Sequence, residues 1–174
     1  MPNILSSLVG HFFSSLDQLG SFKAIEVTEL PEAYQSLLAH DDHMTVTVEA
    51  WHNSLVDVRV LDEKYQGSMY TRKIVLKLQR DNHPVQFGIM RVDLKDLPEI
   101  VKLEIQSQAL PLGRIMIRHH LMRTVELCQL WKINPSPELR LYLQYEKEGA
   151  IYGRTARILV ADKPAVELLE IVTA

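Results

Sequence analysis

Hydrophobic and polar positions alternate most regularly over residues 70–78, which read Tyr-Thr-Arg-Lys-Ile-Val-Leu-Lys-Leu. As a strand, this segment places Tyr70, Ile74 and Leu76 on one face, because successive side chains point to opposite sides. Arg72 falls in phase with this apolar face. An inward guanidinium needs an anion, since it stays charged and is costly to bury unpaired. A structural carboxylate and a ligand carboxylate both meet that need, and alternation by itself favours the structural ion pair.

The same period of two predicts further strands along the chain. They cover residues 44–49, 56–60, 85–94, 139–145, 151–160 and 165–172. We expect the first two to form a hairpin, because the polar segment His52-Asn53-Ser54 lies between them. Gly88 falls inside the third, where glycine often marks a bulge or the close approach of another group. Residues 119–132 fit a helix and a strand equally well.

Apolar residues at helical spacing and helix-start signals predict helices before and between the strands. They cover residues 3–19, 31–38 and 96–105, with a further short helix starting near residue 110. Gly20 is the expected C-cap of the first helix. Together the elements predict a single α+β domain over residues 1–174, with a mostly antiparallel sheet and helices packed on it.

Charge and composition narrow the range of partners. The chain has 174 residues, a mass of 20.0 kDa, a net charge of −3 and a pI near 6.2. These values give no electrostatic reason to expect nucleic acid or an anionic membrane as a partner. No apolar run approaches the length of a membrane span, and no basic leader opens the chain. We therefore expect a cytoplasmic protein.

Familiar catalytic and metal-binding motifs are missing from the sequence. There is no glycine-rich phosphate loop, no HExxH and no GxSxG, and a single cysteine, Cys128, excludes a multi-cysteine zinc site. The adjacent His119 and His120 point apart in a helix or strand, so we do not expect them to share a metal. The remaining histidines are expected at the surface: His11, His40, His43, His52 and His83. Neither a metal nor an organic cofactor is predicted.

Four segments, in this order and with comparable gaps, resemble the chorismate lyase (chorismate–pyruvate lyase) family. They are Leu37-Leu38 with Met44-Thr45, the strand from Tyr70 to Leu76, Pro111-Leu112-Gly113-Arg114, and Tyr152-Gly153-Arg154-Thr155 with Lys163-Pro164. The resemblance covers most of the chain from about residue 30 onward. It implies an α+β fold on an antiparallel sheet, shared with the related UTRA ligand-binding domains.

The resemblance also implies a reaction and a site. Family members convert chorismate into 4-hydroxybenzoate and pyruvate without a metal or an organic cofactor. An arginine that aligns with Arg72 grips the ring carboxylate, and backbone amides at positions matching Met44 and Leu112 donate hydrogen bonds. A glutamate on the final strand meets the ring hydroxyl. By this resemblance Arg72 is a substrate-binding and catalytic residue, which raises the ligand interpretation of that side chain above the structural one.

The final strand departs from the family pattern. A gap-free match from Lys163-Pro164 places Leu169 where the family carries its glutamate. Glu170 follows one residue later and Glu167 lies two residues earlier, each in phase with apolar neighbours, so alternation does not choose between them. We prefer Glu170 as the catalytic acid because Ile171-Val172 resembles the apolar pair that follows the family's glutamate. Glu167 is the alternative, and either acid could instead form a structural pair with an arginine.

Three functions are open from the sequence. The first is chorismate lyase, with a small aromatic carboxylate as substrate. The second is a non-catalytic small-molecule binding module of the UTRA type. The third is a family member recruited to another reaction, such as a natural-product cyclisation. The oligomeric state and the pathway (quinone, phenolic glycolipid or other) are not predicted.

Overall fold

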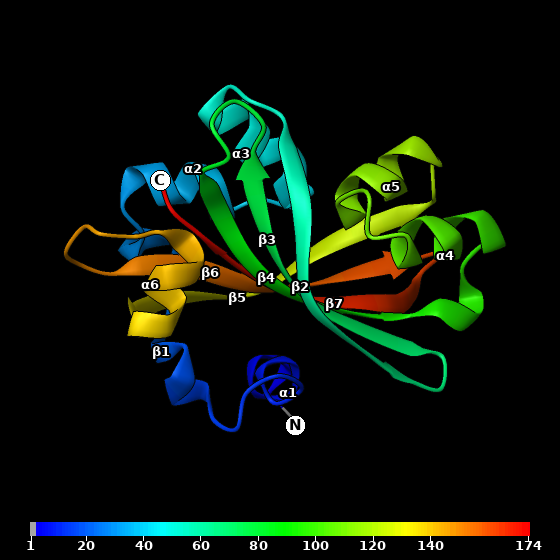
Figure 1. Cartoon of the computed structure of the whole chain (residues 1–174), viewed down its shortest axis with the longest axis horizontal. Coiled ribbons are helices and arrows are strands. Elements are labelled where there is room, and N and C mark those ends of the chain that lie inside the picture. The colour runs from blue at the N-terminus through cyan, green and yellow to red at the C-terminus, as the bar shows by residue number, and fades with distance from the viewer. Residues whose placement is uncertain (1–2) are drawn as a thin grey trace.

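A seven-stranded sheet, in the order β1-β5-β6-β7-β4-β3-β2, organises the chain (Figure 1). The structure is a computed structural model and describes residues 3–174. Its strands are β1 (Gly20–Ile25), β2 (Val56–Gln66), β3 (Met69–Leu78), β4 (Pro84–Asp93), β5 (Arg123–Pro135), β6 (Ile151–Val160) and β7 (Lys163–Val172). Every neighbouring pair is antiparallel. The predicted α+β fold on an antiparallel sheet is therefore confirmed.

Helices cover both faces of this sheet (Figure 1). They are α1 (Ile4–Val9), α2 (Glu32–Leu38), α3 (Met44–His52), α4 (Glu99–Gln106), α5 (Leu112–Arg118) and α6 (Pro137–Leu143). Helices α1 and α6 share one apolar cluster with one face. On the other face, α2 and α3 pack in a second cluster and α4 and α5 in a third. Both faces of the central strands are consequently buried.

The predicted strand over 44–49 is wrong, because these residues begin helix α3. Met44 and Val48 are buried, whereas Val46 between them is 43% exposed. Apolar residues at i and i+4 share one face of a helix, so the same two side chains satisfy both periods. The predicted hairpin with 56–60 is wrong for the same reason, since β2 pairs instead with β3.

The predicted strand over 139–145 is also wrong, and its residues lie mostly in α6. Leu139 and Leu143 are buried while Leu141 is 79% exposed, the same pattern that misled the first assignment. Two helix-start signals precede this segment. The Ser136 hydroxyl accepts a hydrogen bond from the Leu139 amide at 3.1 Å, and Pro137 occupies the first helical position.

The predicted first helix is too long. Helix α1 ends at Val9, and Gly20 begins strand β1 instead of capping a helix. Gly20 has a φ of 136°, and a Cβ there would lie 2.1 Å from the Asn134 carbonyl oxygen, so only glycine fits this strand pairing. Strand β1 was not predicted, and the ambiguous residues 119–132 belong mostly to strand β5.

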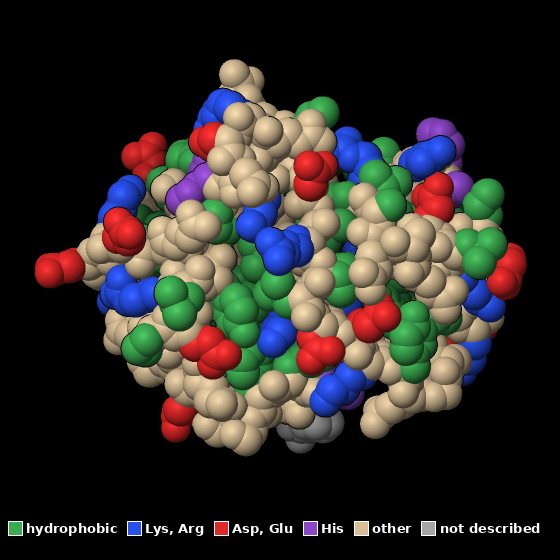
Figure 2. All heavy atoms as spheres, viewed as in Figure 1, with side chains coloured by type: hydrophobic (Ala, Val, Ile, Leu, Met, Phe, Trp, Pro, Cys, Tyr) green, Lys and Arg blue, Asp and Glu red, His purple; other side chains and the backbone are tan. Residues whose placement is uncertain are grey.

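The predicted strand over 56–60 is too short, because β2 continues to Gln66. The remaining predicted strands and the short helices α2, α4 and α5 agree with the structure to within a few residues. Within residues 3–174, no helix is long and apolar enough to cross a membrane. Figure 2 shows acidic and basic side chains scattered among one another over the face in view.

Candidate functional site

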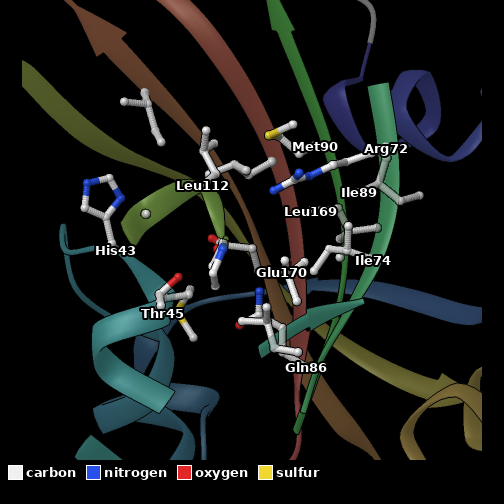
Figure 3. A pocket seen from close by; sticks show the side chains of 18 residues that line it. His43, Thr45, Arg72, Ile74, Gln86, Ile89, Met90, Leu112, Leu169 and Glu170 are labelled. Carbon is white, nitrogen blue, oxygen red and sulfur yellow. The ribbon is translucent and has the colours of Figure 1, made fainter. Parts of the chain in front are cut away.

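A cavity lies on the sheet face that carries α2, α3, α4 and α5, at the junction of their two apolar clusters (Figure 3). Strands β3, β4 and β7 form its floor, and the N-terminal ends of α3 and α5 contribute to its wall. Most of its lining is apolar. The charged or amide side chains that line it are Arg72, Gln86 and Glu170, with His43 and Thr45 at the helical wall.

Strand register sets the order of these groups along the cavity. Three rows of cross-strand partners follow one another: Arg72, Met90 and Leu168; then Ile74, Gly88, Glu170 and Arg154; then Leu76, Gln86 and Val172. Adjacent rows are two residues apart, or about 7 Å along a strand. Gly88 occupies the middle row on β4, and the Ile74 side chain extends over it, 3.4 Å from where a Cβ would lie.

Arg72 points inward, as predicted, and is 2% exposed. Its Nη1 donates to the Ile105 carbonyl at 3.2 Å and its Nη2 to the Leu110 carbonyl at 3.3 Å. Its Nε is buried without a partner. No carboxylate in the described part of the chain forms a salt bridge with Arg72; the cross-strand neighbour Glu63 binds the Tyr70 hydroxyl instead. Burial lowers the pKa of this guanidinium, which nevertheless stays charged.

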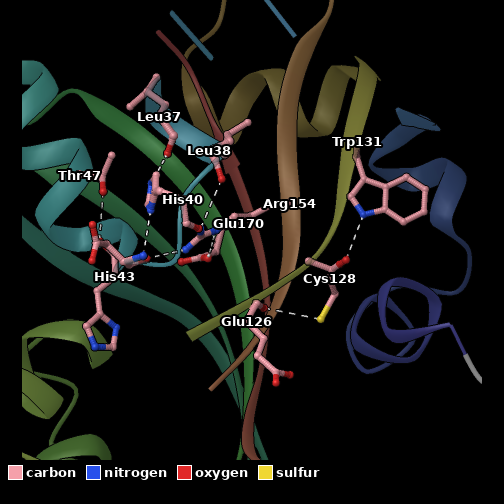
Figure 4. Close-up of polar contacts among 12 residues, drawn as sticks. Leu37, Leu38, His40, His43, Thr47, Glu126, Cys128, Trp131, Arg154 and Glu170 are labelled. Carbon is pink, nitrogen blue, oxygen red and sulfur yellow. Dashed lines mark hydrogen bonds and ion pairs between the residues drawn. The ribbon is translucent and has the colours of Figure 1, made fainter. Parts of the chain in front are cut away.

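Glu170 lines the cavity and also pairs with an arginine (Figure 4). Its Oε1 accepts from Arg154 Nε at 3.0 Å. Arg154 is fully buried, and its other nitrogens donate to the carbonyls of His40 at 2.7 Å and Asp42 at 2.9 Å. The two charges of this pair compensate each other, so Arg72 contributes the positive charge of the cavity that has no salt bridge within residues 3–174; the nearby Tyr70 and Glu63 only oppose the lowering of its pKa by burial.

Glu167 lies on the opposite face of the sheet. It forms a salt bridge with Arg91, which also donates to the Ser7 hydroxyl at 3.0 Å. The structure therefore brings Glu170 to the same cavity as Arg72 and leaves Glu167 outside it. Both acids also form an ion pair with an arginine, which is the structural role that the sequence left open for them.

Met44 and Leu112 also line the cavity, as the first residues of α3 and α5. The N–H of a first helical residue has no acceptor within its own helix and is available to other groups. The two helix ends approach closely at Gly113, where a Cβ would lie 3.0 Å from His43 Cβ and 3.0 Å from Thr45 Oγ1. The structure thus places Arg72, Glu170, Met44 and Leu112 around one cavity.

Two cavity residues were missed by the sequence analysis. His43 is buried, contrary to the surface position expected, and its Nε2 accepts from Arg123 Nε at 2.7 Å. Burial, with the nearby charges of Arg123 and Arg154, lowers the pKa of His43 to about 4. The second residue, Gln86, shares the phase of Gly88 and Met90 on β4, and this phase was the only sequence signal for it.

We expect stability to fall as the pH drops from 6.5 toward 4. Unfolded His43 binds a proton near pH 6.5 whereas the folded side chain does so only near 4. The unfolded state therefore holds more protons in this window and gains from acid. Urea unfolding between pH 4 and 7 measures how steeply the unfolding free energy depends on pH. His43→Gln keeps an acceptor for Arg123 and should make this dependence less steep. An unchanged dependence would show that His43 titrates normally in the folded protein.

The two inward arginines should differ in their contribution to stability without ligand. Arg154→Met strands the Glu170 carboxylate and two loop carbonyls, so we expect a loss of about 3–5 kcal/mol in unfolding free energy. Arg72→Met removes a charge that has no anion, so the loss should be less than half as large. Urea unfolding of both variants tests this comparison. Equal losses would mean that Arg72 has a structural anion in solution.

Comparisons with known proteins show the fold. No protein-family model and no curated protein matches the chain. Among solved structures, the effector domain of PhnF from Mycobacterium smegmatis superposes with a TM-score of 0.53 at 9% identity, covering 76% of this chain and 89% of that one. The ligand-binding domain of a protein assigned to the GntR family of transcriptional regulators, from Bordetella bronchiseptica, gives 0.52 at 12% identity, covering 68% and 86%. The chain thus has the UTRA-related fold of these regulator domains.

Proposed function

We propose that the protein binds a small ring carboxylate in this cavity, with Arg72 as its anchor. The observation that carries the proposal is the state of Arg72, a buried cation with a free Nε and no carboxylate partner among residues 3–174. An inward charge of this kind is costly unless an anion meets it. A ligand carboxylate supplies that anion and fits the planar fork of a guanidinium.

The other charges around the cavity support an anionic ligand. Glu170 is already paired with Arg154, so it leaves the positive charge of Arg72 uncompensated. Met44 and Leu112 line the same cavity as first residues of their helices, so their amides have no acceptor in those helices and would donate to the ligand. The apolar lining, with Ile74, Leu76 and Met90 among its residues, suits the faces of a ring.

The fold likeness supports binding of a small molecule as the function. One superposed structure is the ligand-binding domain of a protein assigned to the GntR family of transcriptional regulators, and the other is the effector domain of PhnF. A non-catalytic module that senses an aromatic carboxylate is consistent with both this likeness and the chemistry of the cavity. This function requires only retention of the ligand and no bond cleavage.

Arg72→Lys should weaken the binding of benzoate and 4-hydroxybenzoate about tenfold to hundredfold. Lysine keeps the charge but loses the fork, and a hydrogen bond to a charged group is worth about 1.5–3 kcal/mol. Isothermal titration calorimetry measures the affinities. The matched control is Arg91→Lys, since Arg91 is a half-buried arginine that pairs with Glu167 on the opposite face of the sheet. Equal effects of both variants, or none of either, would contradict an anchor at Arg72.

Chorismate lyase activity is the second candidate. It is favoured by Glu170, a carboxylate one strand row from Arg72 in the same cavity, as the family resemblance requires. In this reaction the ether bond between the ring and the enolpyruvyl group breaks and the ring carbon that bears the hydroxyl loses its proton. The enolpyruvate released takes up one proton to become pyruvate, and the ring becomes aromatic 4-hydroxybenzoate. Arg72 would hold the ring carboxylate while Glu170 polarises the ring hydroxyl. Aromatisation makes the elimination strongly favourable, so positioning and electrostatic stabilisation suffice.

The lyase candidate predicts that the two strand acids differ in a single-turnover assay with chorismate. Glu170→Gln should slow the formation of 4-hydroxybenzoate and pyruvate more than it weakens substrate binding, because the interaction strengthens in the transition state. Glu167→Gln removes a comparable ion pair outside the cavity and should behave like wild type. Binding of chorismate without product in the wild-type protein would leave the sensing module as the function.

A further inference from the structure

We propose that Gln86 is a specificity-determining residue that accepts a hydrogen bond from the ligand, at the end of the cavity away from Arg72. The ligand class is then narrower than a ring carboxylate. It is a ring acid that also carries a hydroxyl or amino donor on the side remote from its carboxylate. This inference rests on the proposed function, because it concerns the same cavity and the same ligand.

The state of the Gln86 side chain is the main evidence. Gln86 is 4% exposed, and its Oε1 is buried without a hydrogen-bond donor. Across residues 3–174, three buried side-chain atoms lack a partner, and two of them, Arg72 Nε and Gln86 Oε1, belong to residues that line this one cavity. Buried polar groups in proteins are nearly always satisfied, so a pair of exceptions in one cavity points to a missing ligand.

The two unpaired atoms have opposite hydrogen-bonding character. Arg72 Nε is a donor and Gln86 Oε1 is an acceptor. Their rows lie four residues apart along paired strands, or about 13 Å at the backbone, and both side chains extend into the space between. One molecule that carries an acceptor at one end and a donor at the other satisfies both atoms together.

The surroundings of Gln86 favour a donor from the ligand over one from water. Its cross-strand partners in the same row are Leu76 and Val172, both apolar. A buried water typically makes about three hydrogen bonds, and among these strand rows it would find only the Gln86 amide and, one row away, Glu170. A hydroxyl fixed to a ring bound at Arg72 needs no further partner there.

Glu170, in the adjacent row, could compete for the same hydroxyl proton. One hydroxyl donates only one hydrogen bond, so its proton serves either Glu170 or Gln86 at a given moment. A ligand with two donors on adjacent ring atoms could satisfy both acceptors. The experiment therefore uses benzoate, 3-hydroxybenzoate, 4-hydroxybenzoate and 3,4-dihydroxybenzoate, which place donors singly and together.

The test is calorimetric titration of these four acids into the wild-type protein and into Gln86→Met, which has a similar length but no acceptor oxygen. In the wild type, we expect at least one hydroxybenzoate to bind about threefold to tenfold more tightly than benzoate, the effect of one hydrogen bond. Gln86→Met should abolish this gain while leaving benzoate affinity within about twofold, because benzoate has no donor for Gln86. A gain that persists in Gln86→Met would overturn the inference and leave the Arg72 anchor intact.

Stability without ligand gives an independent readout. Gln86→Met removes an unpaired polar atom, so its melting temperature should equal or exceed that of the wild type. The matched control is Gln129→Met, since the Gln129 amide donates to the Ile25 and Leu130 carbonyls outside the cavity. It should lower the melting temperature and keep the preference for the hydroxyl. A clear fall for Gln86→Met would mean that its oxygen has a partner in the folded protein, against the proposal. Failure of all four acids to bind would remove the proposed function and this inference together.

Discussion

Two buried arginines on one sheet face determine how the helices are held above it. Arg154 is compensated by Glu170 and donates to the carbonyls of the loop between α2 and α3. This contact fixes the start of α3, including Met44, next to the central strands. Its donors are distributed over a carboxylate and backbone carbonyls, which is how a buried guanidinium is stabilised in a protein interior.

Arg72 plays the corresponding part for α4 and α5 but is incompletely satisfied. It donates to the carbonyls of Ile105, in α4, and Leu110, just before α5, and so connects this helical pair to strand β3. Carbonyls satisfy its hydrogen-bonding capacity in part and leave its charge without an anion. The cavity lies between the two helix pairs that these arginines hold. Arg72, which anchors one of its walls, is therefore also the side chain that has no salt bridge within residues 3–174.

The opposite face shows what a structural pair looks like in the same fold. Arg91 and Glu167 lie in adjacent strands and bind each other, and Arg91 also contacts Ser7 in α1 and His11 just after this helix. Both charges of this pair are compensated within residues 3–174. The contrast supports a ligand-related role for Arg72, because this sheet readily compensates an arginine where only packing is required.

Glu170 has both a structural partner and a place in the cavity, since it forms a salt bridge with Arg154 and also lines the cavity. A carboxylate held in this way is fixed in orientation by the guanidinium. That arrangement serves a receptor, by shaping the cavity, and an enzyme, by presenting an oriented acceptor to a reacting ring. The geometry of this pair is compatible with both functions, and turnover of chorismate distinguishes them.

Sequence alone determined the antiparallel sheet, the inward direction of Arg72 and the residues that resemble a ring-carboxylate site. Strong alternation in residues 70–78 and the helix-start signals at Pro31, Pro98 and Pro111 carried this information. Tertiary structure decided three further points. Residues 44–49 and 139–145 lie mostly in helices. Exposure of Val46 and Leu141 shows this, because a strand would bury every second residue whereas a helix buries residues four apart. Glu170 and not Glu167 faces the cavity, which alternation could not resolve because helices bury both faces of β7. The absence of a salt bridge to Arg72 within residues 3–174, and of a donor to Gln86 Oε1, depends on contacts between segments far apart in the sequence.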